Sequence, residues 1–329
     1  MIEHRHGRRV GDLARLAPAL LFLVGLAGCS KSVPFDPLQA QGTLTTSGAD
    51  AAAAGGFGSA TFYPLALDNT WNYEGTFHLA LVNPDGTPAG EPDEIQAVEA
   101  DRIIGTEVIN GVPYFVREEV LNESPDPHTG QWVAWSRMRQ DRSGLFAAEV
   151  NVDVSPTLQT STARYAAPSA RRGRPTLDVA VLEKHGLSKA NAAAFAARFE
   201  RLRDAARGWS RSADATHASQ AGELTWLLYP LHIGVEWNIR PDMPWPARVD
   251  RVERIVSKMG PLTAYRIETV PLGIPLLEGE YVRLFYGRVG YIGYSIHSSF
   301  QVTDENGQPT GVTAIVDDTR LLAATGPNS

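Results

Sequence analysis

The stretch Arg102–Leu121, which reads RIIGTEVI-NG-VPYFVREEVL, decides the fold class of this chain. Two runs rich in β-branched and aromatic residues flank the dipeptide Asn110-Gly111. Asn-Gly between two such runs is the strongest short-range indication of a β-hairpin, because both residues tolerate the backbone angles of a tight turn. The sequence therefore predicts one strand from Arg102 to Ile109 and another from Val112 to Leu121.

Further strands are expected on both sides of this hairpin. The run from Thr76 to Val82 alternates between apolar and polar residues and ends at the turn Asn83-Pro84-Asp85-Gly86. Runs of similar character cover residues 131–139, 145–152, 223–229, 248–257, 264–270, 281–286, 291–303 and 312–316. They predict a mainly β fold, in which antiparallel β-meanders form a curved sheet or half-barrel.

Residues 156–221 differ from the β regions around them and predict a helical insertion. Thr176 is positioned to cap a short helix that ends at His185, and Ser188 to cap a second helix from Lys189 to Arg207. One face of the second helix is apolar, since Phe195, Phe199, Leu202 and Ala206 follow at steps of four, three and four. We interpret the segment as a helical hairpin that covers the flank or one end of the β body; a helix lying on a membrane surface is the alternative.

The N-terminus has the features of a secretory signal peptide. Four arginines precede the apolar run Leu16–Leu26, which is too short to span a membrane as a stable helix. The run ends in Leu26-Ala27-Gly28-Cys29, and this motif resembles the lipobox of bacterial lipoproteins. The resemblance implies recognition of Leu26, Ala27 and Gly28 by the signal peptidase, cleavage before Cys29, and acylation of the Cys29 thiol. An ordinary signal peptide with a chance cysteine is the alternative.

The same resemblance implies where the protein resides. The partner of an acylated Cys29 is the lipid bilayer, in which two or three acyl chains give stable anchoring. Ser30 follows the cysteine in place of the Asp that retains lipoproteins at the inner membrane, which favours the outer membrane of the bacterial cell envelope. Residues 1–28 are thus expected to be the signal peptide, and residues 29–60, rich in Gly, Ala, Ser and Thr, a flexible tether.

Charge and cysteine content exclude several classes of protein. The chain has 30 basic and 37 acidic residues, a formal charge of −7, and removal of residues 1–28 makes it −9 because they hold four basic and two acidic residues. A non-specific nucleic-acid binder needs a basic surface and is therefore excluded. A single cysteine excludes an internal disulfide framework and a cysteine-based zinc site.

An internal repeat relates two parts of the β body. Tyr63-Pro64-Leu65 and Trp71 recur as Tyr229-Pro230-Leu231 and Trp237, with a constant offset of 166 residues. Such a duplication predicts two related meanders, residues 61–155 and residues 222–329, the second including a C-terminal tail. Trp71, Trp237, Tyr63 and Tyr229 are then structural residues, with both tryptophans pointing inward. Chance similarity between two short segments is the alternative.

The repeat, a later hairpin and the run Gly287–Tyr294 resemble uncharacterised bacterial envelope lipoproteins over most of residues 61–155 and 222–300. More remotely, the β body resembles the half-barrel of lipoprotein carriers such as LolA and LolB. Both resemblances concern structure, and neither carries a catalytic motif.

The residues predict no catalytic centre, metal site or cofactor. The chain has no Gly-x-Ser-x-Gly, P-loop or His-Glu-x-x-His motif, and its histidines are not at metal-ligand spacing. Glu118 and Glu119 are neighbours on a predicted strand and so face opposite sides. Asp317-Asp318 is interpreted as part of a solvated terminus.

Three tryptophans are candidate contact residues. Trp132 and Trp135 are three residues apart, so one of them is expected outside the core or under the helical insertion. Trp245 lies between two prolines in a rigid extended loop, where either exposure for binding or packing over the barrel mouth is expected.

For function, the favoured hypothesis is a non-catalytic binding or scaffold module, which holds an apolar ligand or another envelope protein between sheet and helical insertion. The alternative is a hydrolase of envelope polymers, whose carboxylates come together from distant strands. Buried, clustered carboxylates in a pocket favour the enzyme, and a dry apolar cavity favours the binder.

Overall fold

The computed structural model describes residues 63–122, 131–161, 171–172, 177, 179–207, 222–241, 244–271, 274–304 and 306–327. All of these residues belong to one compact unit, Ala54–Ser329. The predictions for the signal peptide, the lipobox with Cys29 and the tether lie outside the described residues.

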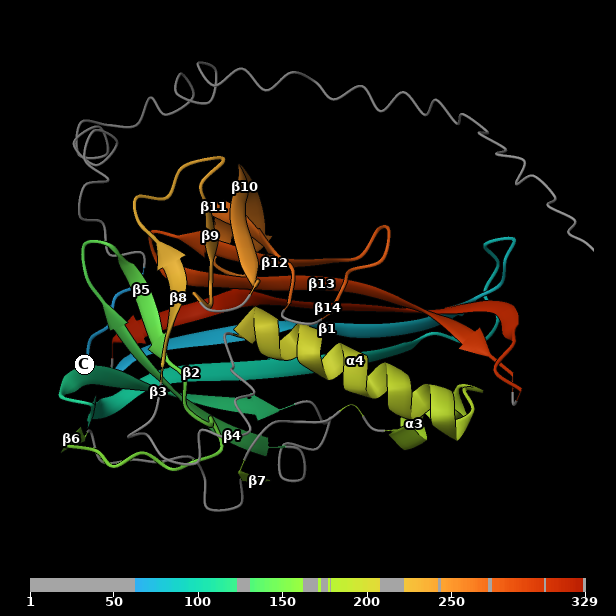
Figure 1. Ribbon diagram of the computed structural model, residues 1–329, viewed down its shortest axis with the longest axis horizontal. Helices are drawn as coiled ribbons and strands as arrows, with labels where there is room; N and C mark the ends of the chain where they lie inside the picture. Colours follow the sequence, from blue (N-terminus) through green and yellow to red (C-terminus); the bar gives the residue numbers. More distant parts are fainter. Residues whose placement is uncertain are drawn as a thin grey trace, which may run out of the picture. The chain divides into compact units, whose positions relative to one another are not determined.

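The first half of the chain forms a meander of long antiparallel strands (Figure 1). Its strands are β1 (Asn69–Val82), β2 (Asp93–Ile109), β3 (Val112–Asn122), β4 (Gln131–Gln140) and β5 (Gly144–Ala148). Asn110 and Gly111 form the turn between β2 and β3, with φ angles of 52° and 80°. Ile109 pairs with Val112 across this turn, so the predicted hairpin is confirmed.

The second half forms another antiparallel meander. It follows β8 (Glu223–Leu228) and consists of β9 (Glu236–Asn238), β10 (Pro246–Ser257), β11 (Gly260–Thr269), β12 (Tyr281–Gly287), β13 (Gly290–Thr303) and β14 (Pro309–Pro327). β8 pairs with β5 and so completes the first meander, while β9 begins the second. The mainly β, antiparallel fold class is confirmed.

Pairing between the two meanders nearly closes the sheet into a barrel. The strand order is β8-β5-β4-β3-β2-β1-β14-β13-β12-β11-β10-β9. In the middle of this order, β1 pairs with β14 along its whole length, from Asn69 opposite Pro327 to Val82 opposite Thr313. At its ends, the Thr225 amide of β8 donates to the Ile239 carbonyl just after β9, at 2.7 Å. The sheet thus closes further than the half-barrel that the sequence predicts.

Between β5 and β8, the described part of the chain contains two helices and two short strands. The short strands are β6 (Thr160–Ser161) and β7 (Arg171–Arg172), and the helices are α3 (Val179–Lys184) and α4 (Lys189–Arg207). The Asn191 amide donates to Ser188 Oγ at 3.3 Å, which is the N-cap that the sequence predicts. α4 contacts β13 and β12 (Figure 1). Neither described helix is long and apolar enough to cross a bilayer.

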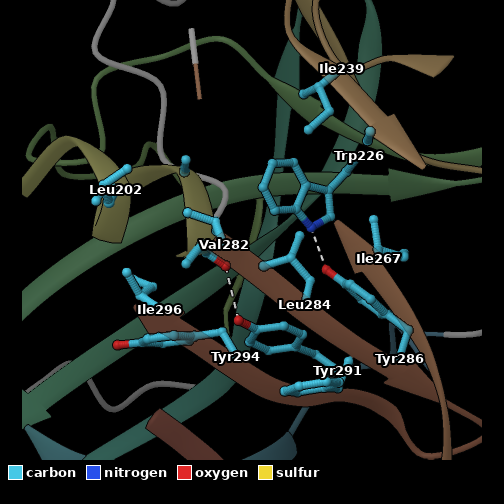
Figure 2. Packing of buried hydrophobic residues seen from close by; sticks show 14 of the residues in the cluster. Leu202, Trp226, Ile239, Ile267, Val282, Leu284, Tyr286, Tyr291, Tyr294 and Ile296 are labelled. Carbon is cyan, nitrogen blue, oxygen red and sulfur yellow. Dashed lines mark hydrogen bonds between the residues drawn. The ribbon is translucent and has the colours of Figure 1, made fainter. Parts of the chain in front are cut away.

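The main hydrophobic cluster joins the inner face of the sheet to α4. Figure 2 shows part of it, where Trp226 Nε1 donates to the Tyr286 hydroxyl. The Tyr291 hydroxyl donates to the backbone carbonyl of Ala206 in α4, at 2.9 Å. Polar atoms of buried aromatic rings are thereby hydrogen-bonded, as burial requires.

The turns that precede β1 and β9 have the same geometry. The Asp68 amide donates to Ile103 in β2 at 3.0 Å, and the Gly234 amide donates to Val249 in β10 at 2.8 Å. Asp68 and Gly234 both have positive φ, 66° and 87°, and they are 166 residues apart in the repeat. In addition, β2 and β10 each have a register shift that begins at the accepting residue. The 166-residue repeat therefore has a counterpart in backbone structure.

Several predicted boundaries are wrong. β1 begins at Asn69 rather than Thr76, β9 was not predicted, and the strand predicted to end at Val316 continues in β14 to Pro327. The interpretation of Asp317-Asp318 as a solvated terminus is wrong as well, since Asp318 is fully buried in the middle of β14. Charged residues at inward positions hide the alternation from which a strand is predicted.

Candidate functional site

Three carboxyl groups converge on the inner face of the first meander. Glu99 and Asp101 are two residues apart on β2, so they share one face, and Asp101 pairs directly with Glu119 of β3. One carboxylate oxygen from each residue lies within 4.8 Å of the others. All three residues are at most 3% exposed. The sequence rules out convergence only for the adjacent pair Glu118-Glu119, and it does not indicate which carboxyl groups meet across strands.

Two buried arginines lie beside these carboxyl groups. Arg117 Nη2 donates to Glu119 Oε1, and Arg117 Nη1 lies 3.5 Å from Asp101 Oδ2. From the end of α4, Arg207 Nη2 lies 3.3 Å from Glu99 Oε2. A metal ion bound by the three carboxylates would lie beside two guanidinium groups, so this arrangement does not fit a cation.

The same arginines hold the C-terminal end of α4. Arg117 Nη2 donates to the Arg207 carbonyl at 3.1 Å, next to the Ala206 carbonyl that accepts from Tyr291. The last carbonyls of a helix lack intrahelical partners and carry partial negative charge, so a guanidinium and a hydroxyl stabilise this end. The polar cluster therefore positions α4.

Contacts with the sheet follow α4 along one stripe, at steps of four residues. Phe195 meets Phe300 and Phe199 meets Phe77, with ring centroids 5.7 and 5.5 Å apart. One turn later, Arg203 Nε lies 3.1 Å from Asp318 Oδ2. The stripe begins at Asn191, whose side-chain Nδ2 donates to the Thr303 carbonyl at 2.6 Å, and it ends at Arg207.

Burial controls the ionisation of this cluster. It is the largest contribution that raises the pKa of Asp101 well above its usual value, and Arg117 opposes it. Among the described residues, neither carboxylate oxygen of Asp101 accepts a hydrogen bond, which fits a neutral carboxyl group. Burial also lowers the pKa of Arg203 and raises the pKa of Tyr294 to about 12. The cluster thus contains a carboxyl group that can hold a proton, but it is covered from solvent by α4.

The residues of the repeat lie in the core. Tyr63 is fully buried and packs on Trp71, 2% exposed, with ring centroids 4.8 Å apart. Trp237 is 9% exposed, and its Nε1 donates to the Thr225 carbonyl at 3.0 Å. Tyr229 is half-buried.

The candidate contact tryptophans do not form an exposed surface. Trp245 is 6% exposed, which agrees with the packing alternative rather than with exposure for binding. Trp135 is 4% exposed, and its Nε1 donates to Glu118 at 3.3 Å in a small cluster on the opposite face from Trp132. Trp132 is half-buried. The structure does not bring these three residues together.

A groove of about 610 Å³ lies beside the β2–β3 turn and includes Val112, Tyr114 and Arg139. The Tyr114 hydroxyl and Arg139 both donate to the carboxylate of Glu223, at 2.7 Å and 2.6 Å. Burial, then the bond to Glu223, raises the pKa of Tyr114 to about 12. Because these polar groups pair with one another, a ligand in this groove would be recognised by the shape of the groove rather than by an unpaired charge.

No protein-family model matches this chain, and no curated protein is significantly similar to it. Among solved structures it is similar to "a putative lipoprotein from Parabacteroides distasonis", with 10% identity, a TM-score of 0.29, and coverage of 81% of this chain and 99% of that chain. It is also similar to "a putative exported protein with YmcC-like fold" from Bacteroides fragilis, with 8% identity, the same TM-score and the same coverage. No argument about function rests on likenesses this weak, and the resemblance to LolA and LolB stays a prediction.

Proposed function

We propose that this chain is a lipid-anchored, non-catalytic protein of the bacterial cell envelope, and that its β body is a scaffold or binding module for another envelope protein. The observation that carries the non-catalytic part is the enclosure of α4. Residues 202–207 are all buried, so the end of the helix is surrounded on every side. Charged groups that an enzyme would use are engaged in holding this helix.

An apolar ligand between sheet and helix is less well supported than a protein partner. The contact between α4 and the sheet is made by Phe77, Phe195, Phe199 and Phe300. Edge-to-face and stacked ring pairs of this kind are close-packed. A ligand at this place would have to displace the helix. We therefore infer that a partner protein binds on the outer surface of the β body.

The anchor rests on the lipobox around Cys29 and on the residue after it. Cells that express the chain are grown with a palmitate analogue, and membranes are separated by density. We expect label on the wild type in the outer-membrane fraction and none on Cys29→Ala, which enters the soluble fraction. Ser30→Asp is the matched control for sorting, and we expect it to be labelled but retained in the inner membrane. A Cys29→Ala variant that stays with membranes would overturn the anchor.

Hydrolysis of envelope polymers remains the second candidate, favoured by the convergence of Glu99, Asp101 and Glu119. Purified wild-type protein is incubated with peptidoglycan and envelope polysaccharide, and the soluble products are measured. We expect none. Product release that Glu119→Gln abolishes, in a variant with an unchanged circular dichroism spectrum, would favour the enzyme.

A further inference from the structure

Two histidines flank one aspartate in a row across three neighbouring strands. Asp317 of β14 pairs directly with His297 of β13 on one side and with His78 of β1 on the other. All three side chains are on the outer face, because the residues beside them, such as Phe77, Ile296 and Asp318, are buried on the inner face.

The structure already shows one of the contacts in this row. His297 Nδ1 and Asp317 Oδ1 lie 2.7 Å apart, with side chains 29% and 45% exposed. On its other side, the imidazole of His297 stacks on Tyr281, with ring centroids 5.6 Å apart and an angle of 25° between the planes. The ring is therefore held in place by its aromatic neighbour, with Nδ1 directed at the carboxylate, so a metal ion could replace the proton between these two atoms and bind both.

We propose that His78, Asp317 and His297 form a surface site for a divalent transition-metal ion, with Zn²⁺ as the ion that fits best. Directly opposite residues on adjacent strands have Cβ atoms about 4.5–5.5 Å apart. In the structure the ligand atoms of these three residues are not all within 4.8 Å of one another, so metal binding requires a His78 rotamer that brings its imidazole over Asp317 toward His297. Two imidazole nitrogens and one carboxylate oxygen are ligands that zinc accepts, with water as the fourth.

A further carboxylate lies in the same row. Glu94 of β2 pairs directly with His78 and is exposed. It is placed to supply a fourth ligand or to hydrogen-bond the His78 ring, which would fix the orientation of that ring. Unlike the carboxylates inside the barrel, this row has no arginine among its direct partners across the four strands.

The test is a calorimetric titration with ZnCl₂. The full chain carries Cys29→Ala in all samples, which removes its single thiol as a competing ligand. We expect one ion per chain for this parent protein, and affinity at least about tenfold weaker for His78→Ala and for His297→Ala. His232→Ala is the matched control, because that exposed imidazole lies 3.2 Å from the Pro230 carbonyl and outside the row. It should bind as the parent does.

A second measurement does not depend on calorimetry. Saturating Zn²⁺ should raise the melting temperature of the parent and of His232→Ala, since a ligand that binds only the folded state stabilises it. Zn²⁺ should not change the melting temperature of His78→Gln or of His297→Gln. These variants keep a polar, outward-facing side chain and so preserve the fold. Wild-type zinc affinity in both His78 and His297 variants would overturn the site, as would a parent protein that binds no zinc.

Discussion

At the scale of single residues, Asp101 is a buried carboxyl group that the fold favours in its neutral form. Its raised pKa means that this stabilisation is present below the unfolded value of 3.8 and is lost as the pH rises through the folded value. Asp101→Asn copies the neutral form, so its stability relative to wild type should increase with pH. Urea denaturation at pH 5 and pH 8 measures this. A variant that is more destabilised at pH 8 than at pH 5 would contradict a protonated Asp101.

Glu119→Gln is the matched control for that experiment. Glu119 Oε1 accepts from Ser136 Oγ at 3.0 Å and from Arg117, so its charge is paired. Breaking a buried ion pair by removing one partner costs about 3–5 kcal/mol. We therefore expect Glu119→Gln to destabilise the protein strongly, in contrast to Asp101→Asn one strand away.

Trp245 gives a second prediction at this scale. Its Nε1 donates to Thr269 Oγ1 at 3.1 Å, and its ring meets Trp226 edge to face with centroids 6.3 Å apart. Trp245→Ala should lower the free energy of unfolding by roughly 3–5 kcal/mol, as for other core tryptophans. Trp245→Phe, which keeps an aromatic ring but loses the hydrogen bond, should cost less. Unchanged denaturation midpoints in both variants would contradict a role for Trp245 in the core.

Individual residues show which features of the fold could not be predicted from the sequence. The two prolines around Trp245 correctly indicate an extended loop, but they do not indicate what packs on it. Likewise, Asp318 and Arg320 interrupt the apolar alternation of β14, although each is at most 1% exposed and each pairs with the other. Burial of paired charges depends on partners that are distant in sequence, and no local pattern reports them.

At the scale of elements, α4 was predicted with its observed bounds, because Ser188 caps it and its apolar stripe has helical spacing. The apolar spacing does not indicate that Arg203 and Arg207 face the sheet as well, where they are at most 3% exposed and pair with Asp318 and Glu99. Amphipathic spacing identifies an apolar face, but it does not identify charged residues of the helix that are buried against charged partners from distant strands.

A double-mutant cycle tests how α4 is held. Arg203→Met and Asp318→Asn, made singly and together, should give a coupling energy of about 0.5–3 kcal/mol in chemical denaturation. The control is Lys258 with Glu74, a pair whose side chains are 67% and 40% exposed. Exposed pairs contribute about 0–1 kcal/mol. Equal coupling in both cycles would mean that the buried pair does not hold the helix.

At the scale of the whole molecule, the repeat and the turns indicate two meanders, but not how they join. β1 pairs with β14, the first strand of the protein's sheet with the last, and β8 meets β9 through the Thr225 amide. Strands so far apart in sequence show no shared local pattern, so closure could not be predicted. The pairing between β1 and β14 is much longer than the contact between β8 and the end of β9, so the β8–β9 side of the barrel is the weaker one.

The long β1–β14 pairing predicts that both meanders unfold together. The two meanders share the main core, since one hydrophobic cluster contains Trp71 of β1, Phe199 of α4 and Ile296 of β13. A domain with one core unfolds in a single cooperative transition, in which the calorimetric and van't Hoff enthalpies agree. We expect this for the chain without residues 1–28, and loss of folding when the chain is ended at residue 308, because β1 then has no neighbour on one side and its inward aromatic residues lose their cover. Two separated thermal transitions, or a folded first meander in the shortened chain, would mean that each half is an independent domain and that the β1–β14 pairing only docks them.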